Sequence, residues 1–320
     1  SCNVNIFDLL IVQPIFNLLI GLYTLIPGGD FGVAIIIFTI IIRFIMYPLV
    51  KKQLHQVKKM RKLQPELERI KRQTKNNKQQ QGMLMMELYK KHDVSPFRTI
   101  GILLIQLPIF IALYHVIQVL TLHRDQVAKY TYDFLENIPA IAQVIKDPDN
   151  FNQTLFGIFD LTKHAFSNGQ VDIFLVALAV IAAITQFIMS KQTMPHTGPK
   201  RKLRDILAEA STGKEADQTE INNIIMGKMA YVLPFLMLFI MLNLPGAIAL
   251  YYAVSNIVAT IQQHFILKQD EEELEQLAEE AVKKHNKKTG KKATAKARAK
   301  QADEATVTRI VASGSKKTKK

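Results

Sequence analysis

The chain has almost no cysteine: Cys2 is the single one in 320 residues. One cysteine excludes an internal disulfide framework. Because Cys2 lies next to the first residue, it fits a lipid-modified terminus left after removal of a signal sequence; the alternative is an unmodified thiol. The sequence begins with Ser1 in place of Met, so we expect a processed or trimmed N-terminus.

Motifs for common enzyme chemistries are also missing. The sequence has no Walker loop, no dinucleotide-binding glycine pattern and no His-Glu-x-x-His motif. Its eight histidines are scattered, without the spacing of metal ligands. We therefore expect no enzyme activity, no metal site and no cofactor.

What the chain does have is strong segregation of apolar and basic residues. Hydrophobic residues make up 48% of the sequence, yet the formal net charge is +14. Apolar runs alternate with Lys-rich segments, which is typical of a protein that crosses a membrane several times. We predict an all-α integral membrane protein with five spans: the first in residues 31–50, the second in 99–122, the third in 171–190, and the fourth and fifth in 224–267.

The segments between the spans differ in character. Residues 1–30 are predicted to hold an amphipathic helix on the membrane surface, the alternative being an extra span. Residues 51–98 carry fourteen Lys/Arg against four Asp/Glu and are predicted to form a helical hairpin. Residues 191–223 are predicted to form a loop. The Lys- and Ala-rich tail 268–320 is predicted to be disordered.

Charge also predicts the orientation of the chain. The segment 123–170 is acidic, whereas the hairpin, the loop and the tail are basic. The positive-inside rule then places the hairpin, loop and tail in the cytoplasm of a bacterial cell and the acidic segment outside. Five spans with the C-terminus inside require the N-terminus outside.

Arg43 stands out because it lies within the apolar run of the first span. In a straight helix it would lie about 12 Å below the basic end of the span, and a guanidinium at that depth costs about 2.5 kcal/mol or more. Arg43 must therefore face water, a partner or a cavity between helices. The alternative is that its long side chain reaches the lipid headgroups.

Further polar residues share helical faces in the predicted spans. Together they predict a wet, positively charged groove that contacts substrates, because the span that holds the arginine has no Asp or Glu to neutralise it; the alternative is polar contact between helices. The predicted groove residues are Arg43, Thr39, Tyr47, Gln106, Tyr114, Gln186, Tyr252, Asn256 and Gln263.

Several motifs, in order along residues 5–268, make the chain resemble the YidC family of membrane protein insertases, which is similar to the mitochondrial oxidase-assembly and thylakoid insertases. They are Arg43 followed by Tyr47-Pro48, MRKLQPE at 60–66, QLPIF at 106–110, LFGIFDL at 155–161, and Pro245-Gly246 followed by Leu250-Tyr251-Tyr252, Asn256 and Gln262. Three features depart from the family pattern. Ser95-Pro96-Phe97-Arg98 precedes the second span where the family often has Asn-Pro followed by Gly residues, position 252 is Tyr where Trp is common, and the extracytoplasmic region is only the acidic segment.

The resemblance implies five helices around a hydrophilic groove, with Arg43 as the groove arginine. It implies that the protein moves nascent membrane proteins from the cytoplasm into the bilayer, alone or with the Sec translocon. The basic tail and loops are expected to bind ribosomal RNA, or alternatively anionic lipid. A small-solute transporter or channel is the alternative function, although we see no internal repeat.

Overall fold

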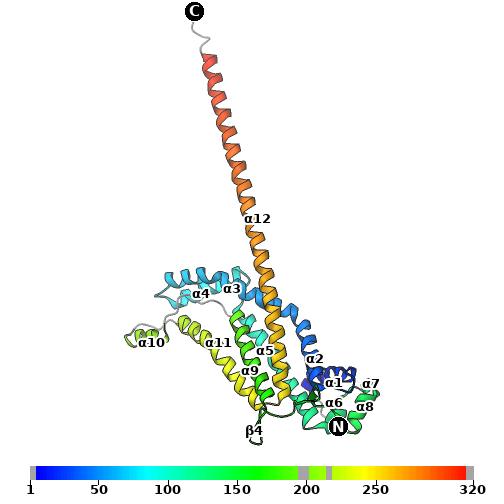
Figure 1. Cartoon of the computed structure of the whole chain (residues 1–320). Helices are drawn as coiled ribbons and strands as arrows, with labels where there is room; N and C mark the ends of the chain where they lie inside the picture. Colours follow the sequence, from blue (N-terminus) through cyan, green and yellow to red (C-terminus); the bar gives the residue numbers. More distant parts are fainter. Residues whose placement is uncertain (1–4, 194–201, 214–217, 315–320) are drawn as a thin grey trace, which may run out of the picture. The chain divides into compact units, whose positions relative to one another are not determined.

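The computed structural model describes residues 5–193, 202–213 and 218–314. The chain divides into two units, Ser1–His264 and Phe265–Lys320, which we describe separately. Helices dominate both units (Figure 1). The long helices are α1 (Gln13–Leu25), α2 (Phe31–Ile45), α3 (Tyr47–Gln73), α4 (Lys78–Lys91), α5 (Pro96–Thr121), α9 (Ile173–Thr193), α11 (Gln218–Asn243) and α12 (Gly246–Gly314), with the shorter α10 (Leu203–Ser211).

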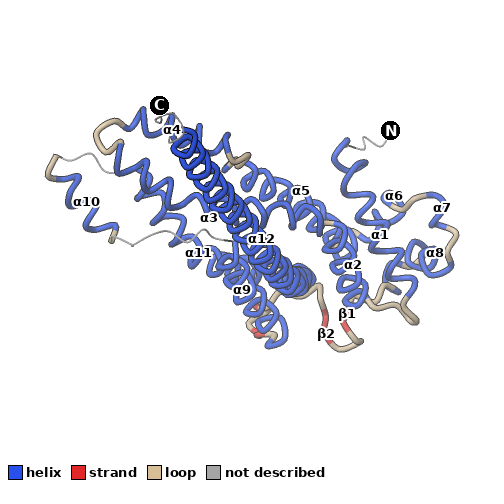
Figure 2. The backbone as a smooth tube through the Cα atoms, turned by 90° about the horizontal axis from the view of Figure 1, so that it is seen from above, coloured by secondary structure: helices blue, strands red, loops and turns tan. Residues whose placement is uncertain are grey.

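Short elements fill the segment between α5 and α9. The helical ones are η2 (Arg124–Gln126), α6 (Val127–Tyr130), α7 (Asp133–Glu136), α8 (Pro139–Lys146) and η3 (Pro148–Asn150). Two antiparallel hairpins follow: β1 (Thr154–Leu155) pairs with β2 (Phe159–Asp160), and β3 (Phe166–Ser167) pairs with β4 (Gln170–Val171). In Figure 2 the hairpin of β1 and β2 lies beside α2.

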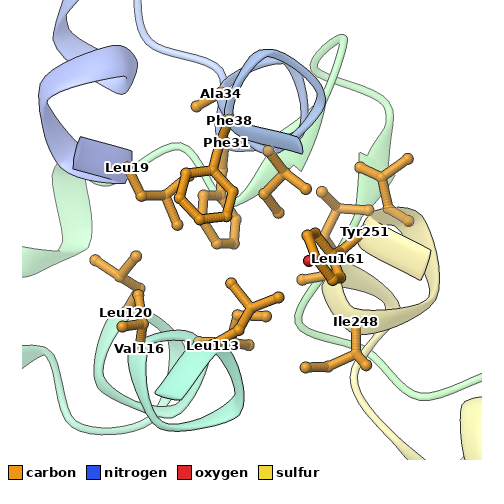
Figure 3. Packing of buried hydrophobic residues seen from close by; sticks show 14 of the residues in the cluster. Leu19, Phe31, Ala34, Phe38, Leu113, Val116, Leu120, Leu161, Ile248 and Tyr251 are labelled. Atoms are coloured by element: carbon orange, nitrogen blue, oxygen red, sulfur yellow. The ribbon is translucent and has the colours of Figure 1, made fainter. Parts of the chain in front are cut away.

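A single large apolar core joins the helices of the first unit. Figure 3 shows Leu19 of α1, Phe31 and Phe38 of α2, Leu113 of α5 and Tyr251 of α12 pointing toward one another. All five side chains are buried. The hydrophobic effect therefore holds together helices that lie far apart in the sequence.

The segment between α5 and α9 covers one end of this helical core. The backbone N–H of Phe31 donates to the carbonyl of Asn152 (3.2 Å), and the N–H of Gly246 donates to that of Lys163 (2.8 Å). These contacts satisfy donors at the N-termini of α2 and α12, which have no partner within their helices. The segment thus closes this end of the unit.

Helices α3 and α4 form a hairpin with a small core of its own. Leu63 and Leu67 from α3, Leu88 from α4 and the following Val94 make a buried cluster separate from the main core. This cluster of four buried side chains packs α3 against α4 and is not part of the main core. We therefore expect the hairpin to unfold more readily than the main core.

The helices differ from the sequence-based expectations in two places. The apolar run 31–50 is not one straight helix, because α2 ends at Ile45 and α3 leaves it at an angle of 55°. The described part of the tail is helical, since α12 continues to Gly314, whereas the sequence predicts disorder for 268–320. Ala, Glu and Lys favour helix, and no proline interrupts the tail.

The number of spans is not fixed by length and composition alone. Among the described residues, Asp8–Leu25 and Ile173–Gln192 are long and apolar enough to cross a membrane. The number of candidate spans rises to four if each of two bent helix pairs counts as one span. These pairs are Phe31–Ile45 with Tyr47–Gln73 and Gln106–Thr121 with Arg124–Tyr130. Five spans thus remain a prediction, and so does the choice between surface helix and span for the N-terminal helix.

Candidate functional site

Arg43 lies in the last turn of α2, against α12. Its Nη2 donates a hydrogen bond to Oε1 of Gln262 (3.1 Å), and Nε2 of Gln262 donates to the carbonyl of Arg43 (3.2 Å). The Arg43 side chain is only 9% exposed, and its Nε has no partner. Among the described residues, no carboxylate contacts this guanidinium.

In this conformation the Arg43 side chain is buried, and both the wet groove and the alternative, a side chain that reaches the lipid headgroups, remain predictions. The requirement for a partner within the helices is met by the amide of Gln262. An amide accepts a hydrogen bond but carries no charge, so the guanidinium stays buried without neutralisation.

A second polar cluster lies between α5 and α12. The side chain of Gln106 is within hydrogen-bonding reach of the hydroxyls of both Tyr251 and Tyr252. The ring of Tyr252 packs 5.8 Å from that of Phe110, and the ring of Tyr251 packs 6.3 Å from that of Phe38. The structure thus brings the predicted residues Gln106 and Tyr252 together.

A third polar cluster joins α9 and α12. Nδ2 of the buried Asn256 donates to the carbonyl of Ala182 (3.1 Å) and lies 3.5 Å from Oε1 of Gln186. Nε2 of Gln186 in turn contacts Oγ of Ser190 (3.3 Å). These hydrogen bonds link α9 and α12. For this cluster the structure therefore shows polar contact between helices, which was the alternative to a wet groove.

The other predicted site residues are placed separately. Thr39 is fully buried and its hydroxyl donates to the carbonyl of Ile35 (2.6 Å), so it offers no free hydroxyl to a ligand. Tyr47 begins α3, beyond the bend, and does not share a helix with Arg43. Tyr114 packs on the main core, and the buried Gln263 has an Oε1 without a partner. Cys2 lies outside the described residues.

Sequence reasoning missed Gln262 and Tyr251 as members of these clusters. Residues 251, 255 and 262 form a polar row on α12 at spacings of four and seven. That row neighbours the row of Tyr252, Asn256 and Gln263, and the spacing alone does not say which row meets α2. Only the packing of α12 assigns Gln262 to Arg43.

The chemistry available here is recognition of charge, because the structure places no acid–base pair or nucleophile at Arg43 among the described residues. The described residues also hold no group of three His, Cys, Asp or Glu side chains that could bind a metal. A buried guanidinium with one neutral partner binds a carboxylate more strongly than the same group does in water.

Comparison with known proteins finds relatives that share one name. The family model described as 60Kd inner membrane protein matches residues 21–273. A protein of Fusobacterium nucleatum named membrane protein insertase YidC is 31% identical over 240 residues, covering 75% of this chain and 87% of that protein. Proteins of the same name from Rickettsia felis and Rickettsia typhi are each 28% identical, but the aligned regions cover 39% and 42% of their lengths.

The match thus extends over most of the chain and most of the Fusobacterium protein. It includes all three polar clusters described above. Members of the family are chaperones of nascent membrane proteins and not enzymes. The chain is an integral membrane protein that belongs to the YidC family of membrane protein insertases.

Proposed function

We propose that this chain inserts nascent membrane proteins through a path in which Arg43 contacts the polar, acidic end of the incoming segment. The observation that carries the proposal is a guanidinium buried in apolar surroundings, hydrogen-bonded to the Gln262 amide and to no carboxylate among the described residues. Burying an ion costs several kcal/mol, roughly, and a neutral amide offsets that cost incompletely. A carboxylate that replaces the amide neutralises the charge of the buried guanidinium.

The exchange takes place at the nitrogens of Arg43. In the resting protein Nη2 is bonded to Gln262, while Nε has no partner. A client Asp or Glu accepts from Nη2 in place of the amide and from Nε, the geometry that makes arginine–carboxylate pairs strong. The contact is transient, because the client then moves on and Gln262 returns.

The clusters of Gln106 with Tyr252 and of Gln186 with Asn256 are proposed to contact the rest of the polar segment; Tyr47, Tyr114 and Gln263 border the same path. Thr39 contributes shape only, since its hydroxyl is bonded to its own helix. The apolar part of the client leaves sideways into lipid. Burial of apolar surface in the bilayer drives the process, so no nucleotide is needed.

The test compares Arg43→Ala with Arg43→Lys in vesicles, using clients with acidic and neutral translocated tails. We expect Arg43→Ala to impair insertion of the acidic clients strongly and of the neutral clients weakly, and Arg43→Lys to restore part of the activity through its charge. Lys191→Ala, which removes an exposed cation at the end of α9, is the matched control. Equal loss for both kinds of client contradicts the proposal.

The orientation and the partners are a separate part of the proposal. The protein lies in the bacterial plasma membrane with its N-terminus outside and its C-terminus in the cytoplasm, as the distribution of Lys and Arg favours.

The basic tail and loops bind the ribosome, and the protein works alone or beside the Sec translocon. Ribosome co-sedimentation of a form limited to residues 1–268 tests the tail: unchanged binding removes this role, and binding to anionic vesicles alone assigns the tail to lipid.

A further inference from the structure

Both small hairpins between α5 and α9 turn through two residues in the left-handed region, but the loop between the paired strands has three residues in the first (156–158) and two in the second (168–169). In the first hairpin Phe156 and Gly157 both have positive φ, 54° and 72°. In the second, Asn168 and Gly169 have φ of 53° and 75°. Gly and Asn adopt a positive φ readily, whereas a bulky aromatic side chain disfavours the left-handed region.

Phe156 is unfavourable for a second reason: it is exposed. Its side chain is 64% exposed, and that of Ile158, on the other side of Gly157, is 74% exposed. The backbone is strained, and the two apolar groups bury too little surface against the described chain to offset that strain. Strain of this kind persists only where the surrounding structure holds it, and such residues cluster at functional positions.

The tip is held rigidly against the start of α2. Oδ2 of Asp30 accepts a hydrogen bond from the N–H of Phe156 (2.7 Å), while Oδ1 caps α2 by accepting from the N–H of Val33 (2.9 Å). Leu155 lies directly over Gly32, where any larger residue would collide with it. The position of Phe156 is therefore tied to the first turn of α2.

The same hairpin also contacts the start of α9. The rings of Phe159 and Phe174 are stacked, with centroids 3.8 Å apart. The neighbouring Ile173 is 81% exposed and begins an apolar row along α9 that continues through the exposed Val180, Ile184 and Ile188. Because α9 is long and apolar enough to cross a membrane, this row faces lipid and the hairpin lies where it begins.

We propose that Phe156 and Ile158 form a lipid anchor that inserts into the bilayer interface at the membrane face where α2 and α9 begin. The partner is the boundary between headgroups and acyl chains, where aromatic side chains are favoured. The attraction is apolar and not electrostatic, because residues 123–172 hold four Lys/Arg against seven Asp/Glu. Through Asp30 and Phe174 the anchor fixes the depth of both helices.

The chain has no tryptophan, so a single introduced tryptophan reports its own surroundings. Phe156→Trp and Ile158→Trp test the anchor, and Asn168→Trp, at the first positive-φ residue of the other hairpin, is the matched control. The full chain is reconstituted in vesicles of phosphatidylcholine with or without bromine on the acyl chains. We expect blue-shifted emission from Phe156→Trp and Ile158→Trp, quenching by brominated lipid and protection from iodide, all unchanged by salt.

Asn168→Trp is expected to be quenched by iodide more than either anchor reporter. Emission from both anchor reporters that is quenched by iodide and not by brominated lipid overturns the proposal. Protection from iodide without quenching by brominated lipid also overturns it and points to a protein contact. The variant Phe156→Asn gives the turn its favoured residue and should fold normally. Combined with Ile158→Trp in one chain, it should reduce the quenching of the introduced tryptophan by brominated lipid.

Discussion

Arg43 and Gln262 are joined by two hydrogen bonds in opposite directions. The guanidinium donates to the amide oxygen (3.1 Å), and the amide nitrogen donates to the carbonyl of Arg43 (3.2 Å). That carbonyl belongs to the last turn of α2, whose carbonyls have no donor within the helix. One glutamine thus holds the charged side chain and also satisfies the end of the helix that carries it.

Gln262→Glu should neutralise Arg43 within the protein. We expect insertion of clients with acidic tails to fall, because the new carboxylate competes with the client, and thermal stability to be unchanged or higher because the buried charge gains a counter-ion. The neighbouring Gln263→Glu is the control: it buries a carboxylate without this partner and should lower thermal stability. Undiminished insertion by Gln262→Glu would contradict the role of Arg43 as a carboxylate site.

Asn17→Ala should loosen the contact between α1 and the segment after α5. The buried Asn17 donates to the carbonyl of Tyr130 (2.8 Å) and accepts from the N–H of Tyr132 (2.8 Å). Leaving such groups unpaired costs about 1–3 kcal/mol. Thermal unfolding in detergent measures the loss, with the exposed Asn150→Ala as a control expected to change stability by less than about 0.5 kcal/mol. Equal effects of the two variants would argue against the contact.

Leu88→Ala should destabilise the hairpin of α3 and α4 and spare the main core. Leu88 is buried in the small cluster with Leu63 and Leu67, and such a truncation costs about 2–5 kcal/mol. We expect faster hydrogen exchange in α3 and α4 with no change in α1. Met86→Ala, on the exposed side of the same helix, serves as the control. Faster exchange in α1 would show that the hairpin is not an independent unit.

The hairpin should also lose stability in alkaline solution. Burial raises the pKa of Tyr89 above its ordinary value of 10.0, because the ionised phenol is poorly solvated in the cluster. The unfolded hairpin therefore releases this proton first, and its stability is complete below pH 10 and declines as the pH rises above 10. Tyr89→Phe removes this proton, so hydrogen exchange in α4 should accelerate less above pH 10 than in the unchanged protein. An identical pH profile would contradict the assignment.

The sequence alone was sufficient for the class of protein and the family. Apolar runs separated by basic segments predict a membrane protein because the bilayer imposes its thickness on any chain that crosses it. The exception at Arg43 could be recognised for the same reason, and the motifs around it resemble one family. The bend at Met46 was not predicted, although Pro48 in the first turn of α3 is a residue that typically begins a new helix or breaks an existing one.

What only the tertiary structure decided is which polar residues meet. Period and spacing place Asn256, Gln262 and Gln263 on one helix, but the rotation of that helix in the bundle determines that Gln262 contacts Arg43 and that Asn256 contacts α9. The exposure of Phe156 likewise depends on how the hairpin docks on α2. The physical reason is that hydrophobicity is a property of each segment, whereas a hydrogen bond between distant segments depends on the packing of all the others.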